Sequence, residues 1–173
     1  EDVLLIKPTI HSDGRGHFIE TFRQDLLDEA IGYKVHFIQD NESKSTKGVL
    51  RGLHYQVEPY TQAKLVRVVE GSVMDVVVDI RKSSPSFGQH VSIELSAQNK
   101  HQLFIPHGFA HGFVALTDNA TFVYKVDNYY SKDHERGIFF NDKQLDIQWG
   151  LPEDILEISD KDKKLPSLDE IDR

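Results

Sequence analysis

A chain of 173 residues is long enough to bury a hydrophobic core, and 39% apolar with 28% charged residues excludes a disordered protein. No apolar run approaches the ~20 residues needed to cross a bilayer, which speaks against a membrane protein. The net charge of −8 speaks against duplex nucleic acid as a partner. The absence of cysteine removes thiolate nucleophiles and sulfur-bound zinc, and it favours a cytoplasmic location.

Short runs rich in Val, Ile, Phe and Tyr recur along the chain with turn residues between them, which predicts β-strands. The predicted strands cover residues 3–6, 17–22, 35–40, 49–55, 64–70, 73–80, 90–96, 102–105, 108–115 and 121–126. One short amphipathic helix is expected at 23–30, and a second helix begins near 166–170. So many short strands predict an all-β, cupin-like antiparallel jelly-roll barrel, formed by one domain over residues 1–173.

Two of these strands carry charged residues on otherwise apolar faces. In the strand at 73–80, Asp75 and Asp79 alternate with valines. Either both aspartates face water, or Asp75 lies inside a polar cavity where its carboxylate orients a histidine or a lysine. Lys64 alternates with Val66 and Val68 in the same way, which is unusual unless the ammonium meets an anion.

The segment 105–113 matches the second half of the metal-site pattern of cupin barrels, Pro-x-Gly-x-x-His, with His111 as its histidine. The first half of that pattern supplies two histidines, but here His54 is followed by Gln56. A divalent ion needs at least three good ligands, and Lys64 nearby would repel it. We therefore expect a barrel without a metal site, and metal-dependent oxygenase chemistry is disfavoured.

The same polar residues suit proton transfer at carbon. A neutral imidazole is a good general base near pH 7, and Lys or Arg side chains stabilise the oxyanion that forms when a proton leaves the carbon beside a carbonyl. A tyrosine on another wall can return the proton to the opposite face. Arg51 and His54 are three residues apart, so strict alternation separates them, and Gly52 suggests a β-bulge that reunites them.

Five stretches, at 37–41, 48–54, 105–113, 124–130 and 159–162, resemble the dTDP-4-dehydrorhamnose 3,5-epimerase family in order and spacing. The resemblance runs nearly end to end. It implies conversion of dTDP-4-dehydro-6-deoxy-D-glucose to dTDP-4-dehydro-L-rhamnose through an enolate, without a cofactor or metal. A C3-only epimerase, or an enzyme for another nucleotide-linked keto sugar, is the alternative within the family. A non-catalytic sugar-binding barrel is an alternative from a different class.

The resemblance implies four catalytic residues: His54 as the base, Asp162 as its orienting carboxylate, Lys64 beside the C4 oxygen and Tyr124 as the acid at C5. Arg51 is expected to face the C4 oxygen together with Lys64. Asp162 is expected to hold the Nδ1 proton of the imidazole and leave Nε2 free. Cationic neighbours such as Lys64 are expected to lower the pKa of Tyr124. Asp160 competes with Asp162, and Tyr129 and Tyr130 compete with Tyr124.

The resemblance also implies a larger set of side chains that bind the nucleotide sugar. In this family the early strands are exchanged across a homodimer, so the first residues of this set are expected to serve the partner's site. The implied binding residues are Arg15, Phe18, Glu20, Gln39, Asn41, Arg51, His111, Tyr130 and Glu135.

Overall fold

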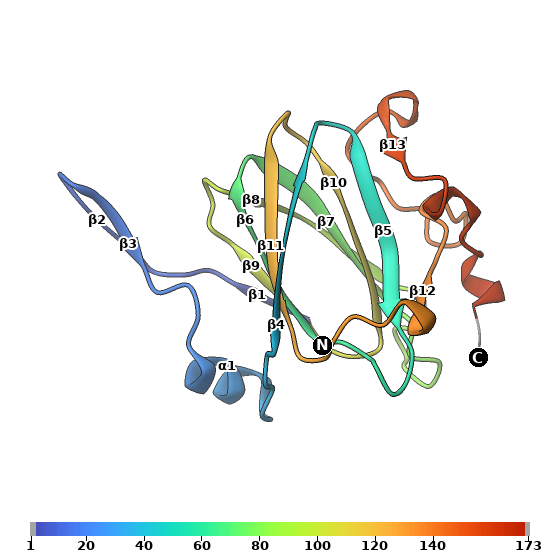
Figure 1. The fold of residues 1–173 in the computed structure, drawn as a ribbon, viewed down its shortest axis with the longest axis horizontal. Coiled ribbons are helices and arrows are strands. Elements are labelled where there is room, and N and C mark those ends of the chain that lie inside the picture. The colour runs from blue at the N-terminus through green and yellow to red at the C-terminus, as the bar shows by residue number, and fades with distance from the viewer. Residues whose placement is uncertain (1–2, 172–173) are drawn as a thin grey trace.

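The computed structural model describes residues 3–171, and Figure 1 shows two antiparallel sheets that face each other, with one hairpin extending away from them. The five-stranded sheet has the order β1 (Leu4–Ile6), β9 (Gln102–Ile105), β6 (Lys64–Glu70), β11 (Ala120–Val126) and β4 (Gln39–Ser45). The six-stranded sheet has the order β12 (Glu135–Gly137), β5 (Val49–Gln56), β10 (Phe109–Ala115), β7 (Ser72–Asp79) and β8 (His90–Ser96), and β13 (Glu157–Ile158) joins β5 in parallel. The extended hairpin is β2 (Ile10–Asp13) with β3 (Gly16–Ile19).

The space between the two sheets is filled mainly by apolar side chains of alternate residues, as the period of a strand requires. Val66, Val77, Leu103 and Phe122 are among the buried residues of this inner core. The predicted antiparallel jelly roll is confirmed. The prediction of one domain includes residues 1–2 and 172–173, which lie outside the described range, and it stays a prediction.

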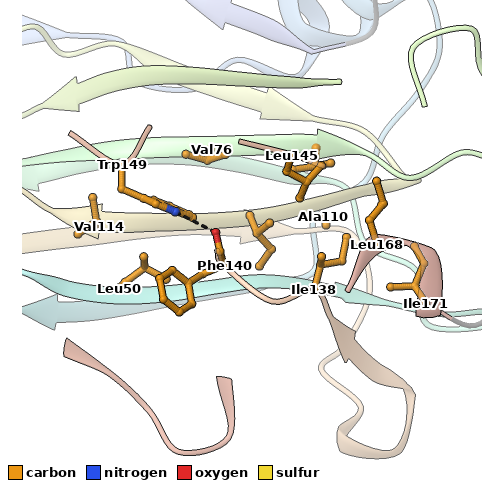
Figure 2. Packing of buried hydrophobic residues seen from close by; sticks show 12 residues of the cluster. Leu50, Val76, Ala110, Val114, Ile138, Phe140, Leu145, Trp149, Leu168 and Ile171 are labelled. Carbon is orange, nitrogen blue, oxygen red and sulfur yellow. Dashed lines mark hydrogen bonds between the residues drawn. The ribbon is translucent and has the colours of Figure 1, made fainter. Parts of the chain in front are cut away.

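The outer face of the six-stranded sheet is covered by the C-terminal part of the chain (Figure 2). Phe140, Leu145 and Trp149 pack there against Val76 and Val114. The Trp149 indole N–H donates to the carbonyl of Phe140 at 3.0 Å, so its polar atom is satisfied inside the apolar layer. Short 3₁₀ turns shape this part of the chain, at Glu153–Ile155, Asp162–Lys164 and Leu168–Glu170, and a further one, Lys132–His134, precedes β12.

The predicted helix is present as α1 (Gln24–Ile31). Leu27 is its buried residue and packs with Leu65 and Phe104 of the five-stranded sheet. The helix ends at Gly32, whose φ of 82° is left-handed and suits glycine. No helix within residues 3–171 is long and apolar enough to cross a membrane.

Most predicted strands lie within one or two residues of the observed ones, but the structure corrects the strand at 35–40. Strand β4 spans 39–45 instead, and its outward residues are charged because only one side of this edge strand pairs, with β11. The predicted strand 17–22 is shorter, and its partner β2 was not predicted. The helix expected at 166–170 is a single 3₁₀ turn capped by Ser167 and Glu170.

Candidate active site

A bulge where β5 meets β10 places Arg51 and His54 on one wall. His54 lies opposite His111 and Arg51 opposite Phe113, so three residues of β5 span what two residues of β10 span. Gly52 has a φ of 128°, and a Cβ there would lie 2.5 Å from the Cα of Gly112. Only glycine fits this close approach. The predicted bulge is confirmed.

The C-terminal part of the chain delivers a carboxylate to His54. Asp162 Oδ1 lies 2.8 Å from His54 Nε2, and Asp162 Oδ2 accepts the backbone N–H of Gly52 at 3.3 Å. Ser159 Oγ in turn accepts the backbone N–H of Asp162 at 3.1 Å. Asp160 is different, because its side chain is 93% exposed and approaches only Lys163. The geometry therefore selects Asp162 over Asp160 as the partner of His54.

The structure corrects which imidazole nitrogen Asp162 holds. The expected contact was with Nδ1, but the observed contact is with Nε2, so Nδ1 is the nitrogen that remains for other partners. Burial would raise the pKa of Asp162, but the hydrogen bond with His54 and the charge on that ring lower it below the ordinary value. A carboxylate that stays ionised holds the Nε2 proton and leaves a lone pair on Nδ1.

The His54 imidazole opens on a cavity of about 380 Å³ between the two sheets. The predicted residues Arg51, Lys64, His111 and Tyr124 line this cavity, together with Asp162. They come from β5 and β10 of one sheet, from β6 and β11 of the other, and from the turn after β13, so both sheets carry polar groups into the cavity. The predicted residues thus bring a base, two cations and a phenol into one cavity.

Lys64 projects from β6 into the cavity in an environment that penalises its charge. Burial lowers its pKa from the usual value for lysine to about 8, and Asp75 and Glu135 oppose the shift only in part. The ammonium is therefore protonated at neutral pH but close to its titration point. A desolvated cation of this kind is a strong hydrogen-bond donor to a negative oxygen.

Tyr124 is half-buried on β11 opposite Asn41 of β4. Burial raises the pKa of its phenol, and Asn41 and Arg51 offset only part of the rise. The expected lowering by Lys64 is wrong, because desolvation of the phenolate outweighs the nearby positive charge. The phenol thus keeps its proton until a strong base takes it.

His111 has its own carboxylate partner. Asp75 is fully buried on the inner face of β7, and its Oδ2 lies 2.8 Å from His111 Nε2. Asp75 therefore lies inside the barrel and contacts a histidine, as predicted, although it does not line the cavity itself. Asp79 is also buried, but it accepts hydrogen bonds from Arg81, Ser84 and Ser86, outside the cavity. The alternative with both aspartates in water is wrong.

Tyr130, Glu135 and Lys161 lie beside the cavity. Glu135 accepts the Tyr130 hydroxyl at 3.0 Å and also accepts Lys161. Burial would raise the pKa of Glu135, but these two donors lower it below its ordinary value. Lys161 lines the cavity next to Asp162 and was not singled out from the sequence. Its position directly before Asp162 in the matching stretch 159–162 was the available signal.

The predicted residues nearest the N-terminus do not reach this cavity. Arg15 and Phe18 lie on the β2–β3 hairpin, and Arg15 pairs with Asp13 while its side chain is 91% exposed. Glu20 lies just beyond the hairpin, 3.7 Å from Arg23. Phe18 is 68% exposed, which is unusual for a large aromatic side chain.

Gln39 and Asn41 lie on the inward side of β4, with the Gln39 amide donating to Asn41 at 2.9 Å. Gln39 also accepts the backbone N–H of Tyr130 at 3.3 Å. Neither residue lines the cavity itself. Tyr129 is 60% exposed and lies outside the cavity lining, so the geometry favours Tyr124 over it. Ser43 of β4, also missed from sequence, lines the cavity and lies opposite Phe122 of β11.

Gln56 stands at the position where the cupin pattern has a second histidine. Its side chain forms hydrogen bonds with loop backbone instead. Its amide donates to the carbonyls of Tyr60 and Tyr129, and its oxygen accepts the backbone N–H of Ser131. Across residues 3–171, no three His, Asp or Glu side chains are placed to hold a metal ion together. The metal-free interpretation stays a prediction.

Comparison with known proteins gives the family of this chain. The family model described as dTDP-4-dehydrorhamnose 3,5-epimerase matches residues 1–170. An enzyme of that name from Shigella flexneri is 60% identical over 161 residues, which cover 93% of this chain and 88% of the relative.

Solved structures agree with the sequence matches. The Legionella pneumophila 3,5-epimerase in complex with dTDP-4-keto-L-rhamnose has a TM-score of 0.94 at 48% identity, over 99% of this chain and 90% of that one. A 3'-monoepimerase from Streptomyces bikiniensis with dTDP-quinovose has a TM-score of 0.89 at 36% identity, over 98% and 85%. The chain therefore belongs to the dTDP-4-dehydrorhamnose 3,5-epimerase family of isomerases.

Proposed function

We propose that this protein converts dTDP-4-dehydro-6-deoxy-D-glucose to dTDP-4-dehydro-L-rhamnose by inverting C3 and C5. The observation that carries the proposal is the cavity itself, in which the His54–Asp162 pair shares one space with Lys64, Arg51 and Tyr124. The Legionella relative, 48% identical, binds dTDP-4-keto-L-rhamnose in its solved structure. A cytoplasmic location stays a prediction.

In this mechanism His54 is the general base. Its Nδ1 takes the proton from the carbon beside the C4 ketone, and Asp162 stabilises the imidazolium that forms through the Nε2–H contact. The electron pair of the broken C–H bond moves to the C4 oxygen as an enolate. Lys64 and Arg51 are the donors for that oxygen, and a donor held in a desolvated site stabilises the charge without reorganising.

Tyr124 returns the proton at C5. Inversion requires delivery to the face opposite the one from which the base removed the proton, and Tyr124 comes from the five-stranded sheet whereas His54 comes from the six-stranded sheet. A phenol with a raised pKa holds its proton until the enolate carbon accepts it. The geometry supports Tyr124 more strongly than Tyr130, whose hydroxyl donates to Glu135.

Epimerisation at C3 alone is the second candidate, because the fold also matches a 3'-monoepimerase. Incubation with dTDP-4-keto-6-deoxyglucose in D₂O separates the two. Inversion at both centres places deuterium at C3 and C5 and yields the L-rhamno product. Label at C3 alone would establish the monoepimerase, and no label at either carbon would refute both.

We also propose that the protein works as a homodimer in which the β2–β3 hairpin of one subunit completes the nucleotide site of the other. The hairpin leaves its own barrel in Figure 1, and it exposes Phe18 and Arg15, which do not line the His54 cavity. In the family pattern these residues, with Glu20, Gln39 and Asn41, bind the nucleotide. Arg51, His111, Tyr130 and Glu135 would bind the rest of the substrate, with Arg51 at the C4 oxygen and His111 against the sugar.

Complementation tests this exchange. Arg15→Ala and His54→Asn each impair every site of their own homodimer. In a mixed dimer with exchanged hairpins, one site has both defects and the other has none. Co-expression of differently tagged chains should therefore recover about half of the wild-type activity per mixed dimer. A hairpin that served its own barrel would leave every site with one defect and give no recovery, and a monomeric mass would also refute the proposal.

A further inference from the structure

Asp75 is a carboxylate that the proposed chemistry does not use. It is fully buried on β7, between Val73 and Val77 on the same inner face, and it is not among the residues that line the cavity. Its Oδ2 contacts His111 Nε2, while its Oδ1, also buried, has no hydrogen-bond partner within residues 3–171.

Such a residue lowers the stability of a barrel. A buried carboxylate oxygen without a partner loses its hydration and gains no hydrogen bond in exchange. An apolar side chain of similar volume is often neutral or stabilising at a position of this kind. The presence of Asp75 among valines therefore indicates a role in function rather than in folding.

The contact with Asp75 decides which atom of His111 carries a proton. A carboxylate oxygen is a hydrogen-bond acceptor, so the Nε2 atom that contacts Asp75 Oδ2 at 2.8 Å carries the imidazole proton. Burial lowers the pKa of His111, with Asp75 offsetting part of the shift, so the ring is neutral at pH 7. The Nδ1 atom then carries a lone pair on a residue that lines the cavity.

Lys64 on the facing sheet is the opposite kind of group. Its ammonium only donates, and Asp75 and Glu135 are the two carboxylates whose charge helps it stay protonated. Three other ionisable groups act on Lys64 and His111. Asp75 acts on both side chains, Glu135 acts on Lys64, and His54 acts on His111. His111 on one sheet therefore accepts hydrogen bonds in the cavity, and Lys64 on the other sheet donates them.

We propose that Asp75 is a positioning residue that sets both roles, holding His111 as an acceptor for a ring hydroxyl of the sugar and Lys64 as a donor to the C4 oxygen. A hydroxyl can donate a hydrogen bond to His111, whereas a ketone or enolate oxygen can only accept one. The keto sugar therefore binds in one orientation, with its C4 oxygen toward Lys64. This inference rests on the proposed function for the identity of the sugar.

The protonation of His111 can be measured without any substrate. In the full-length protein labelled with ¹⁵N-histidine, the ring signals of His111, assigned by their loss in His111→Asn, should show a protonated Nε2 and an unprotonated Nδ1 at pH 7. In Asp75→Asn the amide can donate as well as accept, so the Nδ1-protonated form should gain population. A wild-type His111 protonated on Nδ1, or on both nitrogens, overturns the proposal whatever the enzyme turns over.

Kinetics test the second role. Turnover needs protonated Lys64, so in the wild type it should fall as the pH rises through about 8. In Asp75→Asn this fall should begin at lower pH, and a shift of one unit would reduce turnover at pH 8 by about fivefold. The melting temperature should be unchanged or higher. A lower melting temperature with an unmoved pH profile would mean that Asp75 is merely structural.

Asp79→Asn is the matched control, because Asp79 lies on the same face of β7 and is also buried but contacts Arg81 and two serines instead. It should lower the melting temperature and leave the pH profile in place. Failure of the proposed function would appear as a wild type without deuterium exchange, whereas failure of this inference leaves exchange intact and changes the His111 tautomer or the pH profile.

Discussion

The two faces of the strands β5, β10 and β7 differ in the residues that they carry for the site and for packing. The inner face carries His54, His111 and Asp75, whereas the outer face carries Leu53, Ala110 and Val76 from neighbouring positions of the same strands. Alternate residues of one strand thus serve chemistry on one side and packing on the other. Because the two sets share a backbone, loss of stability and loss of activity should be separable by residue.

The C-terminal part of the chain joins the two faces. Its residues Phe140 and Trp149 pack on the outer face (Figure 2), and further along the chain Asp162 contacts His54. In the apolar layer the Trp149 N–H has its acceptor, whereas the inner side of the sheets holds a desolvated ammonium and, within residues 3–171, the buried Asp75 Oδ1 without a partner. Packing on the outer face offsets the instability of the inner one.

The largest effect on activity is expected from His54→Asn. Loss of a general base lowers the rate ~10³-fold or more, so deuterium exchange at both C3 and C5 should disappear while the melting temperature changes little. His107→Asn is the control, since His107 is half-exposed, pairs with Asp127 and lies outside the cavity. Near-normal exchange in His54→Asn would remove the base assignment.

Lys64→Met should have the second-largest effect on activity. Removing one donor from a preorganised oxyanion site lowers turnover ~10²–10³-fold. Methionine retains the apolar stem without the buried charge, so the protein should be no less stable. Steady-state kinetics at pH 7 should show a change mainly in kcat. A change confined to KM would mean that Lys64 binds the substrate, for example at its diphosphate, without stabilising the enolate.

Tyr124→Phe should affect one carbon only. Loss of a general acid lowers its step ~10²-fold or more, so the variant should make little product inverted at C5. Exchange at C3 should continue, because solvent can supply that proton. NMR analysis of the product formed in D₂O checks both carbons together. Normal inversion at C5 would transfer the acid role to Tyr130, or to a water molecule.

Leu145→Ala on the outer face should have the smallest effect on turnover and a large one on stability. Truncation of a buried leucine lowers the free energy of unfolding by about 2–5 kcal/mol. Denaturant titration measures that loss, and kcat per folded molecule should stay near the wild-type value. If kcat fell in parallel with stability, the two faces would be coupled and the separation described above would not hold.

Strong alternation made most of the barrel predictable from sequence. β6, β8 and β9 match their expected limits because valines, isoleucines and leucines mark them. β4 was misplaced because an edge strand with charged outward residues lacks that apolar signal. β13 was missed because two residues that pair with β5 over a long sequence distance have no local pattern.

The features of the site were likewise only partly predictable from the sequence. Residue types and their order indicated His54, Lys64 and Tyr124, and Gly52 indicated the bulge. The sequence could not indicate which imidazole nitrogen faces Asp162, because ring orientation depends on packing. It also could not give the direction of the Tyr124 pKa shift, which depends on the balance between burial and nearby charge.

The distance along the chain between His54 and Asp162 has a consequence for biosynthesis. The hydrogen bond joins residues 108 positions apart, and most of the barrel lies between them. During translation, the strand that carries the imidazole emerges long before its carboxylate partner. In a chain stalled or cleaved before Asp162, the strands between these two residues would be present, yet the imidazole would have no partner to orient it. Catalytic competence is therefore among the last properties that the growing polypeptide acquires.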